Sequence, residues 1–163
     1  MEIRRIQKNE LQVIRDLALK IWPSTYSGII SEGQMEYMLN WMYSIESLEK
    51  SFNSNHSFFA IYAESEPIGF LDLELNSPAQ KWIKLQKIYI LPEKQKLGFG
   101  LALMDYTFLF ARENKIKHIT LQVNRGNKAV TFYEKLGFFK VDEKDFDIGN
   151  GYFMNDFVMQ KNL

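Results

Sequence analysis

The chain has 163 residues, of which 46% are hydrophobic and 25% are charged. This composition suits one packed domain, expected over residues 1–163, and argues against disorder. The 20 Lys and Arg residues balance the 20 Asp and Glu residues, which argues against nucleic-acid binding, since such proteins usually carry a basic excess. The absence of cysteine excludes disulfides and a cysteine nucleophile. No apolar run approaches the ~20 residues that span a membrane, and we expect a cytoplasmic protein.

The first third of the chain predicts one strand followed by helices. Hydrophobic periodicity indicates a strand over residues 1–6 and helices over residues 9–21, from 31 onward and over 45–52. The segment 22–28 is expected to break the first helix. Ser31 opens the second helix, and Gln34 stands where a capping-box partner belongs.

The rest of the chain alternates strands with two helices. Strands are expected over residues 57–63, 68–75, 82–91, 119–123, 138–141 and 152–160, and helices over 98–115 and 127–136. In the second of these strands four side chains should share one face, namely Ile68, Phe70, Asp72 and Glu74. The order predicts an α/β (α+β) chain with a mixed, mostly antiparallel central sheet of about seven strands flanked by helices.

The loop after the strand at 82–91 has the features of an anion site. Pro92 ends strand pairing because it has no N–H group, and Gly98 and Gly100 let the backbone approach a ligand closely. The first turn of the next helix leaves amide groups unpaired at the positive end of its dipole. These features suit a phosphate or pyrophosphate, although a tight turn before a helix explains two glycines equally well.

The same loop also carries a recognisable motif. Its sequence, Gln95-Lys96-Leu97-Gly98-Phe99-Gly100, resembles the Gln/Arg-x-x-Gly-x-Gly/Ala signature of the Gcn5-related N-acetyltransferase (GNAT) superfamily. The preceding Ile88-Tyr89-Ile90-Leu91-Pro92 and the later Leu121-Gln122-Val123-Asn124 resemble two further family segments. The resemblance implies a GNAT-like acyl-CoA N-acyltransferase fold with acetyl-CoA as co-substrate. The implied cofactor-binding residues are Ile88, Tyr89, Ile90, Gln95, Lys96, Leu97, Gly98, Phe99, Gly100, Asn124, Asn127 and Tyr133.

Tyr133 lies in the predicted last helix, where periodicity alone favours a core position. In the GNAT superfamily the tyrosine at this place often directs its hydroxyl at the cofactor sulfur, so the resemblance implies a general acid. Amine attack on a thioester releases a thiolate, which benefits from a proton donor. Asn124 and Asn127 also have ordinary interpretations, as a turn former and as a helix cap.

The acceptor amine must lose a proton, and the carboxylate expected for this step is missing. Many family members carry a glutamate where this chain has Lys84. Asp72 and Glu74 on the adjacent strand are the nearest substitutes, although both are equally well explained as surface charges. A water chain, or an amine that is already neutral, would also serve.

The acceptor side of the site is less well defined. Trp22 and Tyr26 lie in the predicted helix break and are candidates for the acceptor pocket. The predicted reaction is acetyl transfer to a primary amine of a small molecule (polyamine, amino acid or antibiotic-like compound) or of a peptide or protein, through a ternary complex. An acetyl-CoA sensor of the same fold is the alternative that Lys84 keeps open. His56 and His118 have no second ligand residue nearby, and no metal is expected. The 15% aromatic content is compatible with a homodimer, and no membrane partner is expected.

Overall fold

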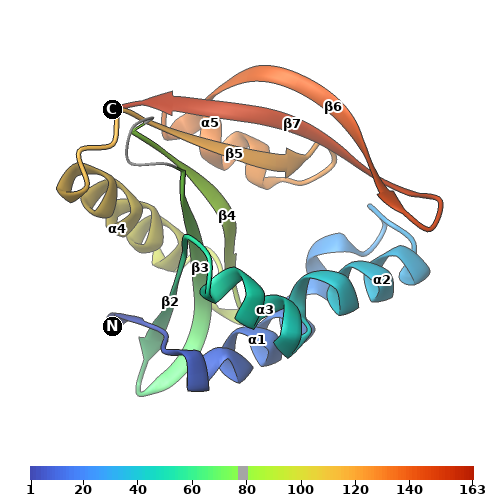
Figure 1. Cartoon of the computed structure of the whole chain (residues 1–163), viewed down its shortest axis with the longest axis horizontal. Helices are drawn as coiled ribbons and strands as arrows, with labels where there is room; N and C mark the ends of the chain where they lie inside the picture. Colours follow the sequence, from blue (N-terminus) through green and yellow to red (C-terminus); the bar gives the residue numbers. More distant parts are fainter. Residues whose placement is uncertain (77–80) are drawn as a thin grey trace.

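The computed structural model describes residues 1–76 and 81–163 and has seven strands in one sheet. The strands are β1 (Glu2–Arg5), β2 (His56–Ala63), β3 (Glu66–Asn76), β4 (Trp82–Ile90), β5 (His118–Asn124), β6 (Phe139–Gly149) and β7 (Tyr152–Asn162). Their order is β1-β2-β3-β4-β5-β7-β6 (Figure 1). All neighbours are antiparallel except β4 and β5, which are parallel. The predicted mixed, mostly antiparallel sheet is therefore confirmed.

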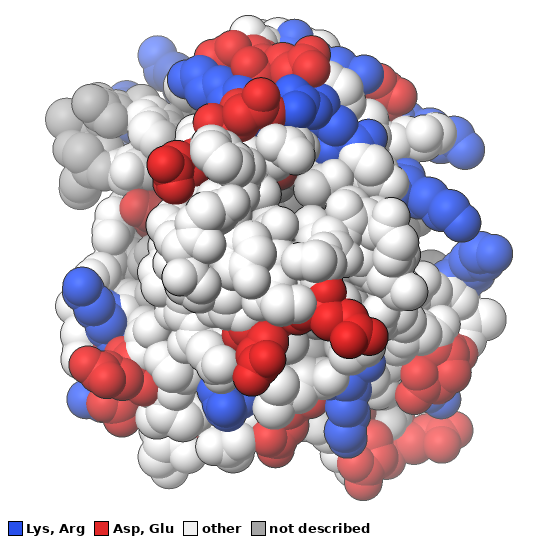
Figure 2. Space-filling model, turned by 90° about the vertical axis from the view of Figure 1, so that its right-hand side faces the viewer, with Lys and Arg blue, Asp and Glu red and all other residues white. Residues whose placement is uncertain are grey.

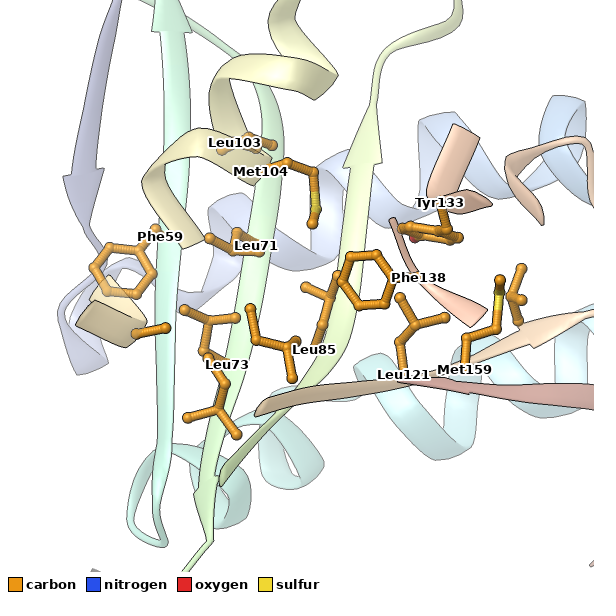
Figure 3. Packing of buried hydrophobic residues seen from close by; sticks show 14 of the residues in the cluster. Phe59, Leu71, Leu73, Leu85, Leu103, Met104, Leu121, Tyr133, Phe138 and Met159 are labelled. Atoms are coloured by element: carbon orange, nitrogen blue, oxygen red, sulfur yellow. The ribbon is translucent and has the colours of Figure 1, made fainter. Parts of the chain in front are cut away.

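Helices cover both faces of this sheet. They are α1 (Leu11–Tyr26), α2 (Glu32–Tyr43), α3 (Ile45–Phe52), α4 (Phe99–Glu113) and α5 (Ala129–Lys135), with 3-10 turns η1 (Lys8–Glu10) and η2 (Pro92–Lys94). One core lies between the sheet and α4 and α5 and includes Leu71, Leu85, Leu103, Leu121 and Met159 (Figure 3). The other lies under α1 to α3 and includes Ile14, Trp22, Tyr43, Phe58 and Phe70. Within the described residues, no helix is both long and apolar enough to cross a membrane.

The first helix is longer than the sequence predicts. The expected break at 22–28 is only partly right, because α1 continues through Pro23 to Tyr26 and ends at Ser27 and Gly28. Pro23 has no N–H group for the carbonyl of Leu19, but Leu19 is exposed and water can satisfy that group. The hydroxyls of Ser24 and Thr25 both donate to the Ile21 carbonyl at 3.0 Å, which holds the last turn together.

Two expectations about the strands also need correction. Ile68 does not share a face with Phe70, because it packs in the core under α4; an irregularity in the β2–β3 register between Ile61 and Tyr62 accounts for the change of face. The strand expected at 138–141 extends to Gly149 as β6. Nearly all of β6 is exposed, so it lacks the alternation of apolar and polar residues that reveals a half-buried strand.

The β6–β7 hairpin reaches across to α2. The Tyr37 hydroxyl donates to the Ile148 carbonyl at 2.6 Å, and the Gln34 side chain donates to the Phe153 carbonyl at 2.6 Å. Ser31 caps α2 by accepting from the Gln34 amide, so only this half of the predicted capping box is present. Figure 2 shows the side where α2 and the hairpin meet: an uncharged area lies in the centre, and charges of both signs crowd the upper edge. Charges along an edge strand such as β6 discourage pairing with other chains.

A buried ionic cluster ties β2, β3 and β4 together. Asp72 of β3 is fully buried and pairs with Lys87 of β4 at 2.7 Å and with His56 of β2 at 2.8 Å. Burial by itself would raise the pKa of Asp72, but the Lys87 ammonium and the His56 ring hold it below its ordinary value. Because the folded-state pKa is lowered, this stabilisation is present above the unfolded carboxyl pKa of ~4 and is lost as the pH falls further.

Replacing Asp72 should therefore destabilise the fold. Asp72→Asn should lower the free energy of unfolding at pH 7 by about 3–5 kcal/mol, because it leaves the Lys87 charge buried without its partner. Adding Lys87→Met should recover most of the loss, since the orphaned charge is then gone. Urea unfolding measures both variants. Glu66→Gln, at an exposed position of the same strand, is the control and should change stability by less than about 0.5 kcal/mol. No recovery in the double variant would contradict this account.

Candidate active site

The parallel contact between β4 and β5 is short. The two strands pair only over residues 82–85 and 118–121, although β4 continues to Ile90 and β5 to Asn124. The register between β3 and β4 shifts at Gln86, and such a bulge bends a strand and increases its twist. Beyond it the two strands diverge (Figure 1). Among the described residues, the edge of β4 that faces β5 therefore carries backbone groups without a strand partner.

The loop after β4 forms a cradle of backbone amides. Lys96 and Gly98 have positive φ values of 62° and 87°, and Gly98 is the N-cap residue of α4. The Ala102 amide donates to the Gly98 carbonyl at 3.0 Å. Over the described part of the chain, the amides of residues 96–101 have no acceptor. These donors at the positive end of α4 are suited to a phosphate group.

Two residues fix the shape of this cradle. The Gln95 side chain donates to the Ile90 carbonyl at 3.1 Å, which anchors the loop to the end of β4. Gly100 lies in the first turn of α4, where an added Cβ would meet only the Phe132 ring at 3.9 Å. Leu97 is exposed. The loop thus presents backbone rather than side chains to a ligand.

Three tyrosines from different elements meet beside the split between β4 and β5. The hydroxyls of Tyr26 (α1) and Tyr89 (β4) share a hydrogen bond of 2.7 Å. Burial raises the pKa of Tyr26 to about 12, with the Tyr89 hydrogen bond opposing this shift. Burial, and next the Tyr26 hydroxyl, raise the pKa of Tyr133 (α5) well above its ordinary value. Burial also raises the pKa of Tyr89 well above its ordinary value, so all three hydroxyls stay protonated at neutral pH.

The Tyr133 hydroxyl is accessible although its ring is buried. The ring is packed 5.7 Å from that of Phe138, and Figure 3 shows the two side by side near Leu121 and Met159. Within the described residues, no side-chain oxygen is both sealed from solvent and unpaired. Since Tyr133 has no hydrogen-bond partner there, its hydroxyl must reach solvent. It can therefore donate a hydrogen bond to a bound molecule.

The turn after β5 holds the two predicted asparagines. Asn124 accepts from the Gly126 amide at 2.8 Å, and Asn127 accepts from the Ala129 amide at 2.9 Å. Both side chains thus close local turns by accepting from an amide two residues on, and the N-cap residue of α5 is Lys128. Asn127 also lies close enough to Tyr26 to lower the pKa of that hydroxyl. Arg125 forms ion pairs with Glu143 and Asp145 on β6, which makes it part of the surface rather than of a phosphate site.

The structure places Trp22 behind the site. Its side chain is only 1% exposed, its indole N–H donates to the Tyr43 hydroxyl at 3.3 Å, and its ring lies 4.5 Å from that of Tyr26. Trp22 therefore positions Tyr26. Of this pair, Tyr26 places its hydroxyl at the split.

The two carboxylates predicted near Lys84 already have partners. Asp72 is held in the ionic cluster described above, and Glu74 accepts a hydrogen bond from Gln86. The Lys84 ammonium donates to the Gln122 side chain at 2.6 Å, and burial lowers its pKa. Over residues 1–76 and 81–163, no three His, Cys, Asp or Glu side chains are placed to hold a metal ion.

Asp156 also lies at the site, although the sequence does not indicate it. Asp156 on β7 is 95% buried, with 5% of its surface exposed, and its register partner is Asn124 at the end of β5. Burial raises the pKa of Asp156 to about 6, against the opposing fields of Lys84 and Arg125. The only local signal is a charged residue inside an otherwise strand-like segment, and that pattern does not tell which face the residue occupies.

Two solved structures of the same architecture are named as N-acetyltransferases. The PaiA N-acetyltransferase from Thermoplasma acidophilum, solved in complex with coenzyme A, matches with a TM-score of 0.83 and 28% identity, over 99% of this chain and 98% of that one. The ribosomal-protein-S18-alanine N-acetyltransferase from Escherichia coli shares the fold, with a TM-score of 0.75 at 15% identity over 99% and 92% of the two chains.

Sequence comparison identifies the family. Residues 27–154 match the model of the acetyltransferase (GNAT) domain, so the chain belongs to the GNAT family. A spermidine N(1)-acetyltransferase from Thermoplasma acidophilum is 29% identical over 167 residues, which are 99% of this chain and 96% of that protein. The chain is thus an N-acetyltransferase, and acetyl-CoA is its acetyl donor. The amide cradle and the open edge of β4 fit the phosphates and the amide-bearing arm of this donor.

The cradle predicts how acetyl-CoA binding responds to its glycines. Gly98→Ala should weaken binding by about 1–2 kcal/mol, or about 5- to 30-fold in Kd, because a Cβ disfavours the left-handed conformation at φ 87°. Gly100→Ala is the matched control and should change Kd by less than about threefold, since its backbone is helical and only Phe132 is near. Isothermal titration calorimetry with acetyl-CoA measures both. Equal losses in the two variants would contradict the role of the Gly98 conformation.

Proposed function

We propose that this enzyme transfers the acetyl group of acetyl-CoA to a primary amine of a small molecule, by direct attack within a ternary complex. The observation that supports this most strongly is the position of the accessible Tyr133 hydroxyl beside the split between β4 and β5. At this split the sheet is open to both of its faces, the one covered by α4 and α5 and the one covered by α1 to α3. A donor and an acceptor approaching from opposite faces would therefore meet without any covalent enzyme intermediate.

The donor would be bound mainly by backbone groups. Those of Ile88, Tyr89 and Ile90 on the open edge of β4 are placed to pair with the pantetheine arm as an added strand would. The amides of residues 96–101 would bind the pyrophosphate. Asn124 and Asn127 lie at the other side of the split and would complete the binding site for the arm.

Tyr133 would act on the leaving group. Its raised pKa keeps the hydroxyl protonated before reaction, so it is available as a hydrogen-bond donor. A hydrogen bond to the developing thiolate stabilises the charge, and the proton can follow as the carbon–sulfur bond breaks. Desolvation by the surrounding rings strengthens this hydrogen bond.

A polyamine is the acceptor class best supported. The relative from Thermoplasma acidophilum is named for spermidine, and the sheet face beside the split carries the carboxylates of Glu74 and Asp156. Carboxylates in a partly buried site favour an amine that carries several positive charges. The Lys84 ammonium on the same face is held by Gln122.

The first test is binding followed by turnover. Acetyl-CoA at 100 times its Kd should stabilise the protein by about 2.7 kcal/mol, visible as a rise in Tm. A thiol-release assay over polyamines, amino acids, aminoglycosides and peptide N-termini should then show acceptor-dependent CoA release, fastest with a polyamine. Stabilisation by acetyl-CoA without release for any acceptor would favour an acetyl-CoA sensor of the same fold.

A second test addresses Tyr133. Tyr133→Phe should lower kcat by about 100-fold or more, because the thiolate loses its proton donor, while Kd for acetyl-CoA stays within about twofold. Steady-state kinetics and calorimetry measure the two quantities. Tyr106→Phe on α4 removes a hydroxyl outside the site and should leave kcat unchanged. A Tyr133→Phe enzyme with full turnover would exclude the general-acid role.

A further inference from the structure

We propose that Asp156 is the general base of this enzyme, accepting the proton of the acceptor ammonium at the split between β4 and β5. This assignment rests on the proposed function and deepens it, since it names the group that selects and activates the amine. It also replaces the family's missing β4 glutamate with a carboxylate from a different strand.

The position of Asp156 in the sheet supports this role. Asp156 pairs in register with Asn124, the last residue of β5, at a level where β4 has already diverged. Side chains alternate along a strand, so Asp156 shares its face with Met154 and Val158. Met154 packs on the core under α1 to α3, which places Asp156 on the α1–α3 face of the sheet and away from the α4/α5 face.

The carboxylate of Asp156 is buried but has no partner. It is 95% buried, yet among the described residues it accepts no hydrogen bond and forms no ion pair. Because no side-chain oxygen in that part of the chain is both sealed and unpaired, its oxygens must still face an accessible space. Burying a carboxylate without a partner is costly, and the arriving ammonium would supply the missing partner.

The charged groups around Asp156 are engaged elsewhere. Lys84 of β4 is bound to Gln122, and Arg125 at the end of β5 is paired with β6 carboxylates. Lys144, opposite Asp156 on β6, pairs with Asp142 at 3.0 Å, and Tyr26 of α1 is protonated. With its pKa raised to about 6 by burial, Asp156 is ionised at pH 7 and is more basic than an ordinary carboxylate.

The space next to Asp156 suits an extended amine. Val158, two residues along β7, lines a pocket of about 370 Å³ together with Thr120, Gln122 and Phe146. Its walls mix apolar and uncharged polar groups with the ammonium groups of Lys84 and Lys144, so the pocket suits the uncharged alkyl part of the amine. An alkylamine chain can lie along this pocket with its terminal nitrogen at Asp156 and the split.

Acetyl transfer from the thioester to an ammonium releases one proton overall. The acceptor ammonium gives one proton to Asp156, directly or through one water, and Asp156 later returns it to solvent. The nitrogen lone pair forms the N–C bond while the C–S electron pair leaves on sulfur. Sulfur takes a proton from Tyr133, and the second proton of the nitrogen replaces it. The products are the acetamide, CoA and one released proton.

The test is the pH dependence of Asp156→Asn with the best amine from the acceptor panel. Wild-type kcat/KM should fall as the pH drops through about 6 and stay level from pH 7 to 9. The variant should lose about 100-fold in kcat/KM at pH 7 and then rise about tenfold per pH unit, because only neutral amine reacts. Its Kd for acetyl-CoA should not change. With a fluorinated analogue of the amine, neutral at pH 7, the loss should shrink to less than about tenfold.

Controls separate the possible outcomes. Asp16→Asn, the same change at an exposed position of α1, should leave the profile intact, and Glu74→Gln tests the competing carboxylate. A wild-type profile in Asp156→Asn, or a higher KM with unchanged kcat, would overturn the base assignment while acetyl transfer stands. A wild-type enzyme that binds acetyl-CoA but acetylates no amine would overturn the proposed function itself. Asp156→Asn should fold at least as well as wild type at pH 8, since it removes an unpaired buried charge.

Discussion

The early end of the β4–β5 ladder is the constraint on which the rest of the site depends. A parallel pair normally satisfies the backbone groups of both strands, and here it does so only over residues 82–85 and 118–121. Backbone groups need hydrogen-bond partners, so an open strand edge inside a sheet is suited to a ligand that carries its own amides. The same divergence lets side chains from α5, α1 and β7 approach one point from both faces. The proposed donor-binding edge and the proposed catalytic side chains thus both depend on the early end of the β4–β5 pairing.

The aromatic groups beside the split depend on the first helix. Because α1 continues through Pro23, its last residue, Tyr26, reaches the hydroxyl of Tyr89 on β4. Trp22 fills the space behind them, within 6.1 Å of the Tyr89 ring. A helix that ended before Trp22 would leave Tyr26 in a loop, without the rigid support that keeps its hydroxyl in the site.

The sequence predicts those features that arise from local signals. The anion cradle follows from Pro92 and Gly98, and the order of strands and helices follows from periodicity. What it misses depends on the register between strands. A bulge at Gln86 changes which side chains of β4 share a face. The environment of Asp156 depends on the pairing of β7 with β5, which is distant in sequence. The length of β6 is missed because an exposed edge strand has no apolar face to reveal it.

Asp72 and Asp156 lie on the same face of one sheet, but their surroundings give the two carboxylates different pKa values and different roles. Asp72 has two partners, the Lys87 ammonium and the His56 ring, and a lowered pKa, which makes it a structural anchor and a poor base. Asp156 has no partner and a raised pKa, so it is free to accept a proton. The positive charge of Lys84 limits the rise in the pKa of Asp156, so that Asp156 is ionised at neutral pH. Lys84 on β4 and Asp156 on β7 therefore act together electrostatically. Lys84 stands where many family members carry a glutamate, and its charge adjusts the pKa of Asp156, the carboxylate proposed to take over the role of that glutamate.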